Sequence, residues 1–170
     1  MLPIFSFAVF WRMRASFLCF EEELSMTNFM IYGANGYTGS LIAREAVRRA
    51  IRPIIAGRSS ENLARLASEL ELEHRVFSLE SPEAVCDGIR GVHTLLHCAG
   101  PFSRTSKPMA DACLKTGTHY LDITGESDVF EAMAARDAEA IAAGIVLLPG
   151  VGFDGHTFIA FVKSDGNVHK

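Results

Sequence analysis

The sequence predicts an α/β fold, in which helices cover a doubly wound parallel sheet of about six strands. From residue 29 onward, short apolar runs alternate with stretches of helical spacing, and glycine-bearing turns separate them. This alternation is typical of strand–helix–strand units, whose right-handed crossovers build a parallel sheet. The expected strands are residues 29–32, 53–56, 75–79, 92–98, 119–123 and 145–148.

Apolar residues at helical spacing predict the helices between these strands. The first helix has an apolar face between residues 43 and 50, and the second has one between residues 63 and 70. Ser59 or Ser60 could cap the second helix. Three more helices are expected at residues 82–88, 107–116 and 128–143, ending at Gly88, Gly117 and Gly144.

Composition limits the classes of partner. The 170 residues are 49% hydrophobic and carry a formal net charge of −4, without a long basic run. Nucleic acid is therefore not an expected partner. The four cysteines contain no CxxC pair, so no metal site is expected and the thiols are predicted to be reduced, as in a cytoplasmic protein.

Residues 1–25 differ in composition from the rest of the chain. They hold five of the 12 Phe and the only Trp, without a clean helical or strand period. Arg12 and Arg14 interrupt the apolar stretch too early for a membrane span. We expect an extension outside the domain, with Met26 as the natural start, and an interfacial membrane anchor is the alternative.

A glycine-rich loop follows the first expected strand. Its three glycines have the spacing GxxGxxG and lead directly into a helix. Glycines let the backbone approach a pyrophosphate, whose charge then meets free N–H groups and the positive end of the helix dipole. The alternative is a closely packed strand-to-helix turn. The candidate cofactor-binding residues of this loop are Gly33, Asn35, Gly36, Tyr37, Thr38 and Gly39.

The second expected strand ends at a basic residue where an NAD-binding fold normally has an acidic one. Arg58 lies there, 19 residues after Gly39, and Ser59 follows it. A guanidinium beside hydroxyl groups suits the 2′-phosphate of NADP. The sequence therefore favours NADP as the cofactor, with a solvated helix-start arginine as the alternative.

The turns that follow the fourth and fifth expected strands contain small residues and carboxylates. Ala99, Gly100, Pro101 and Phe102 form a small-residue bend, which we expect beside the pyrophosphate or nicotinamide half of the cofactor. Asp122 and Glu126 follow the fifth strand. For these two carboxylates, orienting a substrate and capping the next helix both stay open, and no catalytic residue is assigned.

Several other chemistries lack their motifs. The sequence has no Tyr-x-x-x-Lys pair, no G-x-S-x-G elbow and no H-E-x-x-H. His93 and His97 are four residues apart on an expected strand, which separates them by about 13 Å. That distance is too long for one metal ion, so we expect them to be core or edge histidines.

The motifs GANGYTG, AGRS, HCAGPF, THYLDITGE and PGVGFD together resemble the saccharopine dehydrogenase-like oxidoreductases, including trans-acting enoyl reductases. The resemblance covers about residues 26–154 and implies a Rossmann NADP-binding domain. In that family a substrate domain follows, so residues 155–170 are expected to be a divergent tail of a truncated form.

This resemblance implies an oxidoreductase that transfers hydride to a C=N or C=C bond of a small-molecule substrate. It also admits a homo-oligomer. The alternative is a non-catalytic NADP-binding module that regulates a full-length partner.

Overall fold

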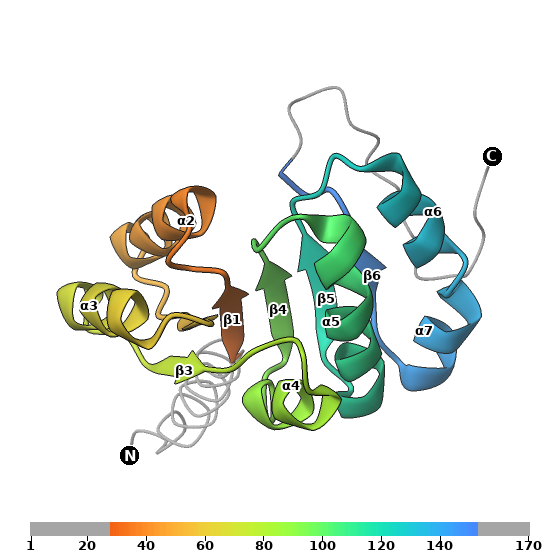
Figure 1. The fold of residues 1–170 in the computed structure, drawn as a ribbon, viewed down its shortest axis with the longest axis horizontal. Helices are drawn as coiled ribbons and strands as arrows, with labels where there is room; N and C mark the ends of the chain where they lie inside the picture. Colours follow the sequence, from red (N-terminus) through yellow and green to blue (C-terminus); the bar gives the residue numbers. More distant parts are fainter. Residues whose placement is uncertain (1–27, 153–170) are drawn as a thin grey trace, which may run out of the picture.

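The computed structural model describes residues 28–152, and the expected extension 1–25 and tail 155–170 lie outside these residues. One sheet of six parallel strands has the order β3-β2-β1-β4-β5-β6 (Figure 1). The chain moves outward from β1 on one side, returns to β4 and moves outward on the other, so the doubly wound prediction is confirmed. The strands are β1 Phe29–Tyr32, β2 Ile54–Gly57, β3 His74–Val76, β4 Thr94–His97, β5 His119–Asp122 and β6 Leu147–Leu148.

Helices cover both faces of the sheet. Alternate residues of β1 point to opposite faces: Ile31 packs in the cluster that includes α2 and α3, whereas Met30 and Tyr32 pack with α4 to α7. No helix in the described part of the chain is long and apolar enough to cross a membrane. The helices are α2 Tyr37–Arg48, α3 Ser60–Leu70, α4 Pro82–Gly88, α5 Phe102–Thr116, α6 Ser127–Ala134 and α7 Asp137–Ala143.

The expected helix ends at glycines are confirmed. Gly117 and Gly144 follow α5 and α7 in the left-handed conformation, with φ of 73° and 67°. A glycine adopts this conformation without steric cost and lets the chain leave the helix. Helix α4 ends at Gly88, and its expected N-cap Ser81 accepts a hydrogen bond from Ala84 N.

Several expected boundaries were wrong, and β4 and β6 are shorter than the expected 92–98 and 145–148. Strand β3 ends at Val76, because the chain turns there toward α4 instead of continuing to residue 79. Helix α5 begins at Phe102, five residues before the expected start. The single helix expected at residues 128–143 is two helices, because Arg136 leaves helical geometry between them and pairs with Asp111 of α5, at 2.6 Å.

The strand register aligns the carboxyl ends of the central strands. Tyr32, the last residue of β1, pairs with Ala56 on β2 and with His97 on β4. His97 in turn pairs with Asp122 on β5. The turns that follow these strands therefore lie side by side at one edge of the sheet, next to the point where the strand order reverses.

Candidate functional site

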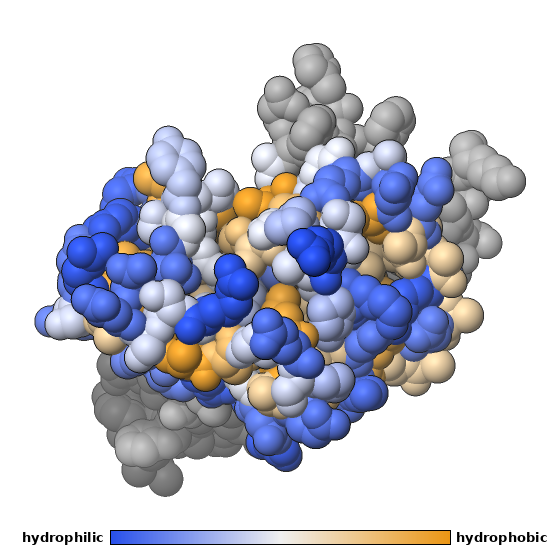
Figure 2. Space-filling model, in the orientation of Figure 1, coloured by the Kyte–Doolittle hydropathy of each residue, from blue (hydrophilic) through white to orange (hydrophobic). Residues whose placement is uncertain are grey.

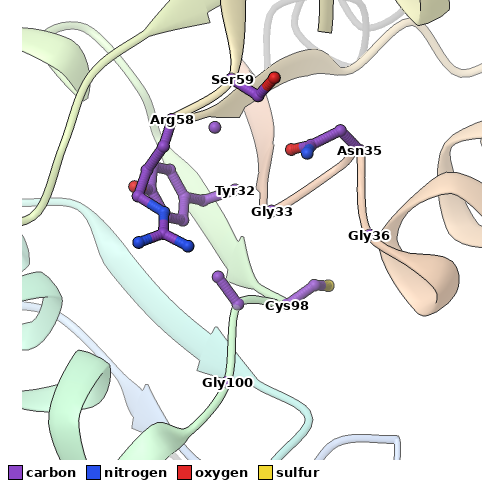
Figure 3. Close-up of a pocket in the computed structure, with 10 residues that line it drawn as sticks. Tyr32, Gly33, Asn35, Gly36, Arg58, Ser59, Cys98 and Gly100 are labelled. Carbon is purple, nitrogen blue, oxygen red and sulfur yellow. The ribbon is translucent and has the colours of Figure 1, made fainter. Parts of the chain in front are cut away.

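A cavity of about 510 Å³ lies where the turns after β1, β2 and β4 meet (Figure 3). Open α/β sheets bind ligands at this place, outside the carboxyl ends of the strands. A second cavity of about 350 Å³ shares four of its residues, Tyr32, Arg58, Ala99 and Gly100. The first cavity is lined by Tyr32, Gly33, Asn35, Gly36, Gly57, Arg58, Ser59, Cys98, Ala99 and Gly100.

Two glycines of the β1–α2 loop are required by the packing of the protein itself. Gly33 has φ of +82°, and a Cβ there would lie 2.9 Å from the Cβ of Ala99. A Cβ on Gly39 would collide with the carbonyl oxygen of Gly33. The loop is also fixed to β2, since Gly33 N and Ala34 N both donate to Ala56 O, at 2.7 and 3.2 Å.

The middle glycine, Gly36, is exposed and lines the cavity. It is the N-cap of α2 and has no side chain to accept the free N–H groups of the first turn, which also contains no acidic residue. A Cβ on Gly36 would meet a single protein atom, Gly33 O, at 3.2 Å. The positive end of the α2 dipole therefore opens toward the cavity that Gly36 lines.

The β2–α3 turn supplies polar side chains. The Arg58 guanidinium extends along the cavity in front of Tyr32, toward the β4–α5 turn (Figure 3). Ser59 is the N-cap of α3, but its hydroxyl makes no capping hydrogen bond. Asn35 reaches this turn from the glycine loop: a Cβ on Gly57 would lie 2.6 Å from Asn35 Oδ1.

Three residues that line the first cavity were not among the candidates expected from the sequence: Tyr32, Gly57 and Cys98. They end β1 and β2 or directly follow β4, so the same rule about strand ends could have included them. Burial raises the pKa of Tyr32 to about 12, and its hydroxyl donates to Phe77 O at 3.1 Å. Burial, and secondarily the charge of Asp122, raises the pKa of the Cys98 thiol to about 12.

The twelve residues predicted from the sequence divide into three groups. Seven line the first cavity: Gly33, Asn35, Gly36, Arg58, Ser59, Ala99 and Gly100. Pro101 lines only the second cavity. The other four line neither: Gly39 and Phe102 are buried, whereas Tyr37 and Thr38 are exposed in the first turn of α2.

The β4–α5 turn is held by a carboxylate from a distant part of the chain. Glu126 accepts hydrogen bonds from Phe102 N at 2.7 Å and from Ser103 N at 2.9 Å, so it caps α5. The hydrogen bond from the Ser103 side chain, and after it these two backbone hydrogen bonds, lower the pKa of Glu126. The Thr105 hydroxyl donates to Ala99 O at 2.7 Å and to Pro101 O at 3.0 Å. These hydrogen bonds therefore fix the β4–α5 turn, whose small residues form one wall of the cavities.

Asp122 has a comparable role at the next turn. Its buried carboxylate accepts hydrogen bonds from Tyr120 Oη at 2.6 Å and from Thr124 N and Gly150 N at 2.9 Å each. Burial raises the pKa of Tyr120, and the charge of Asp122 raises it further. Neither Asp122 nor Glu126 lines the two cavities. Neither side chain caps the next helix, α6, as one of the two interpretations expected: Glu126 caps α5 instead, and Asp122 holds the turns after β5 and β6.

His97 is a core histidine that lies beneath the site. The sequence predicted a position either in the core or at an edge of the sheet. It is fully buried and packs against Tyr32 and Phe102, with ring centroids 5.6 and 5.3 Å away. Burial lowers its pKa to about 3, so the ring is neutral. No group of three metal-ligating side chains occurs within residues 28–152.

Comparisons with known proteins agree with this arrangement. Residues 29–148 match the family described as "Saccharopine dehydrogenase NADP binding domain". The human saccharopine dehydrogenase-like oxidoreductase is 28% identical over 147 residues, covering 75% of this chain and 34% of that protein. The trans-acting enoyl reductase of Mycobacterium leprae is 30% identical over 151 residues, covering 84% of this chain and 35% of that protein. The chain thus spans about a third of the length of these relatives.

Solved structures show the same fold. Saccharopine dehydrogenase (L-Glu forming) from Saccharomyces cerevisiae superposes with a TM-score of 0.64 at 16% identity, over 75% of this chain and 28% of that one. Citrobacter triphenylmethane reductase, which was solved with NADP(H), gives a TM-score of 0.53 at 17% identity, over 69% of this chain and 46% of that one.

Proposed function

Since this chain belongs to the saccharopine dehydrogenase NADP-binding domain family, we propose that the cavity at the ends of β1, β2 and β4 binds NADP(H). The family membership confirms the resemblance seen in the sequence motifs. The observation that carries the proposal is the shape of the β1–α2 loop, where Gly36 leaves the α2 N-terminus open toward the cavity.

The loop suits the diphosphate of a dinucleotide. A diphosphate needs N–H donors and a positive field, and both are available in the uncapped first turn of α2. Tyr37 and Thr38 lie in this turn, and we propose that their backbone N–H groups donate hydrogen bonds to the diphosphate. Gly33 and Gly39 hold the loop in shape by allowing its close contacts with Ala99 and within itself.

The β2–α3 turn suits a 2′-phosphate. Arg58 extends along the cavity, and the Ser59 hydroxyl is not used to cap α3. A guanidinium forms charge-assisted hydrogen bonds with phosphate oxygens, which NADH does not present at this position. We therefore propose that Arg58 and Ser59 select NADP(H) over NAD(H).

The β4–α5 turn would lie beside the pyrophosphate or nicotinamide half of the cofactor. Ala99 and Gly100 leave room there, and Phe102 supports the turn from the core. When bound, NADPH supplies hydride, and we propose a C=N or C=C bond of a small-molecule substrate as its acceptor. This proposal concerns the oxidoreductase as a whole, of which the described domain forms the cofactor side.

A non-catalytic NADP-binding module is the second candidate. It is favoured because the ionisable groups near the cavity have other roles: the Asp122 and Glu126 carboxylates hold turns, and a raised pKa keeps the Cys98 thiol protonated.

Free thiols at Cys86, Cys98 and Cys113 fit a reducing compartment, and we propose the cytoplasm.

Binding of NADPH and NADH to the purified chain, measured by calorimetry, tests the cofactor assignment. We expect NADPH to bind more tightly, and Arg58→Ala to weaken NADPH binding by about 10- to 100-fold with little effect on NADH. Arg90→Ala is the matched control, because Arg90 pairs with Asp87 on α4, away from the cavity. Absence of binding by either dinucleotide would overturn the proposal.

Turnover separates the two candidate functions. The purified chain is mixed with NADPH and an imine or enoyl acceptor, and loss of NADPH absorbance is followed. Oxidation of NADPH that depends on the acceptor would overturn the binding module. Tight binding without oxidation would leave that module standing, but it would not exclude the oxidoreductase, because the chain spans about a third of the length of its relatives.

A further inference from the structure

The second cavity brings together Arg58 and Arg104, neither of which forms an ion pair with a residue in the described range 28–152. Within residues 28–152, six arginines form ion pairs with carboxylates: Arg44, Arg48, Arg49, Arg75, Arg90 and Arg136. Neither Arg58 nor Arg104 forms one with any described residue, and both line the 350 Å³ cavity. With Glu80, the three charged side chains that line this cavity sum to +1, so an anion would be attracted to the two arginines.

The two arginines come from separate elements on different walls of this cavity. Arg58 follows β2, whereas Arg104 is the third residue of α5. The position of Arg104 is fixed, since its N–H donates to Pro101 O at 3.1 Å and Glu126 caps the same helix end. The fixed backbone keeps the base of the Arg104 side chain beside the cavity.

Apolar side chains form much of the wall between the two guanidinium groups. Tyr32, Leu79, Pro101 and Pro108 line the cavity, with polar groups from the β3–α4 turn at its margin. Figure 2 shows strongly hydrophilic residues on either side of an apolar hollow in the middle of this face. A ligand with a flat, largely apolar ring and a phosphate group near that ring fits a cavity with apolar walls and two arginines.

We propose that Arg104 is a second specificity residue, which binds the 2′-phosphate of NADP(H) together with Arg58. This inference rests on the proposed function and adds a residue of α5 to it. Glu80 also lines the cavity, and its charge would repel a phosphate. A phosphate bound here would therefore be held by the two arginines and would lie away from Glu80.

The test compares wild type, Arg104→Ala, Arg104→Lys and the control Arg90→Ala. Dissociation constants are measured by calorimetry for NADPH, NADH and adenosine 2′,5′-bisphosphate, which keeps the phosphate but lacks the nicotinamide. Arg104→Ala should weaken NADPH and the bisphosphate by about 10-fold or more, and NADH by less than about twofold. Arg104→Lys should recover part of the loss, and added salt should reduce the difference between wild type and Arg104→Ala.

The outcomes separate this inference from the proposed function. Failure of the wild type to bind any dinucleotide would overturn both. Loss of NADPH preference in Arg58→Ala but not in Arg104→Ala would overturn the role of Arg104 alone. Equal weakening of NADPH and NADH by Arg104→Ala would also overturn it, because the arginine would then act on a part that both cofactors share. Circular dichroism of each variant confirms that the comparison is made on folded protein.

Discussion

The three glycines of the β1–α2 loop do different work, although they form one motif. Gly33 and Gly39 are needed for contacts within the protein, because side chains there would meet Ala99 or the carbonyl oxygen of Gly33. Gly36 lines the cavity, and a Cβ there would meet one protein atom, Gly33 O, at 3.2 Å, a milder contact than those at Gly33 and Gly39. The spacing GxxGxxG predicts the loop but does not distinguish these roles, since Ala99 lies far away along the chain.

This difference predicts opposite effects for two alanine substitutions. Gly39→Ala should lower the free energy of unfolding by roughly 1–3 kcal/mol, because the added methyl group forces a backbone shift. Gly36→Ala should change stability by less than about 1 kcal/mol but weaken NADPH binding by about 10-fold, because the methyl group lies where the diphosphate approaches.

Urea unfolding and calorimetric titration of both variants check these two expectations. The same loss of stability in both variants would mean that Gly36 is also a packing residue. Unchanged NADPH affinity in Gly36→Ala would place the diphosphate elsewhere.

At the scale of elements, contacts between distant residues decide where helices begin and end. Helix α5 starts at Phe102 because Glu126, 24 residues later, accepts its first N–H groups. Helices α6 and α7 separate at Arg136, which pairs with Asp111 of α5. Local spacing predicts that these helices exist, but their boundaries depend on partners that only the fold brings close. The glycine caps of α5 and α7 are local, and they were predicted correctly.

Glu126 predicts a pH-dependent contribution of the α5 cap. Its pKa is lowered in the folded protein, because the carboxylate accepts hydrogen bonds at α5. The stabilisation is therefore present above the ordinary pKa of glutamate and is lost as the pH falls through the lower, folded-state pKa. Glu126→Gln should lower the melting temperature by about 2–4 °C at neutral pH, and the difference from wild type should vanish in acid.

Thermal unfolding of both proteins across this pH range measures the effect. A difference that persists unchanged below the folded-state pKa would show that the charge of Glu126 is not its cause. Glu131→Gln is a suitable control, since Glu131 is an exposed carboxylate on α6.

At the scale of the whole molecule, strand alternation was enough to predict six parallel strands and the edge at which the cavities lie. It was also enough to select Arg58, because that position follows directly from a strand end. Tyr32 and Cys98 were missed although they lie at the same edge, and Arg104 was missed because it lies on a helix. Only the packing of α5 against the sheet brings Arg104 to the cavity that Arg58 lines.

Cofactor binding should couple the two halves of this sheet. The first cavity is formed by turns after β1 and β2, which continue into α2 and α3, and by the turn after β4, which continues into α5. A ligand that contacts all three turns binds the folded state and not the unfolded chain. At a concentration of 100 times its dissociation constant, NADPH should then add about 2.7 kcal/mol of stability, which raises the melting temperature by about 5–10 °C.

Differential scanning calorimetry with NADPH measures this shift as one cooperative transition. NADH at the same concentration should give a smaller shift, and Arg58→Ala should lose most of the difference between the two cofactors. A transition that splits in two, with only one part responding to NADPH, would mean that the ligand contacts one half of the sheet and that the site does not extend across β1 to β4.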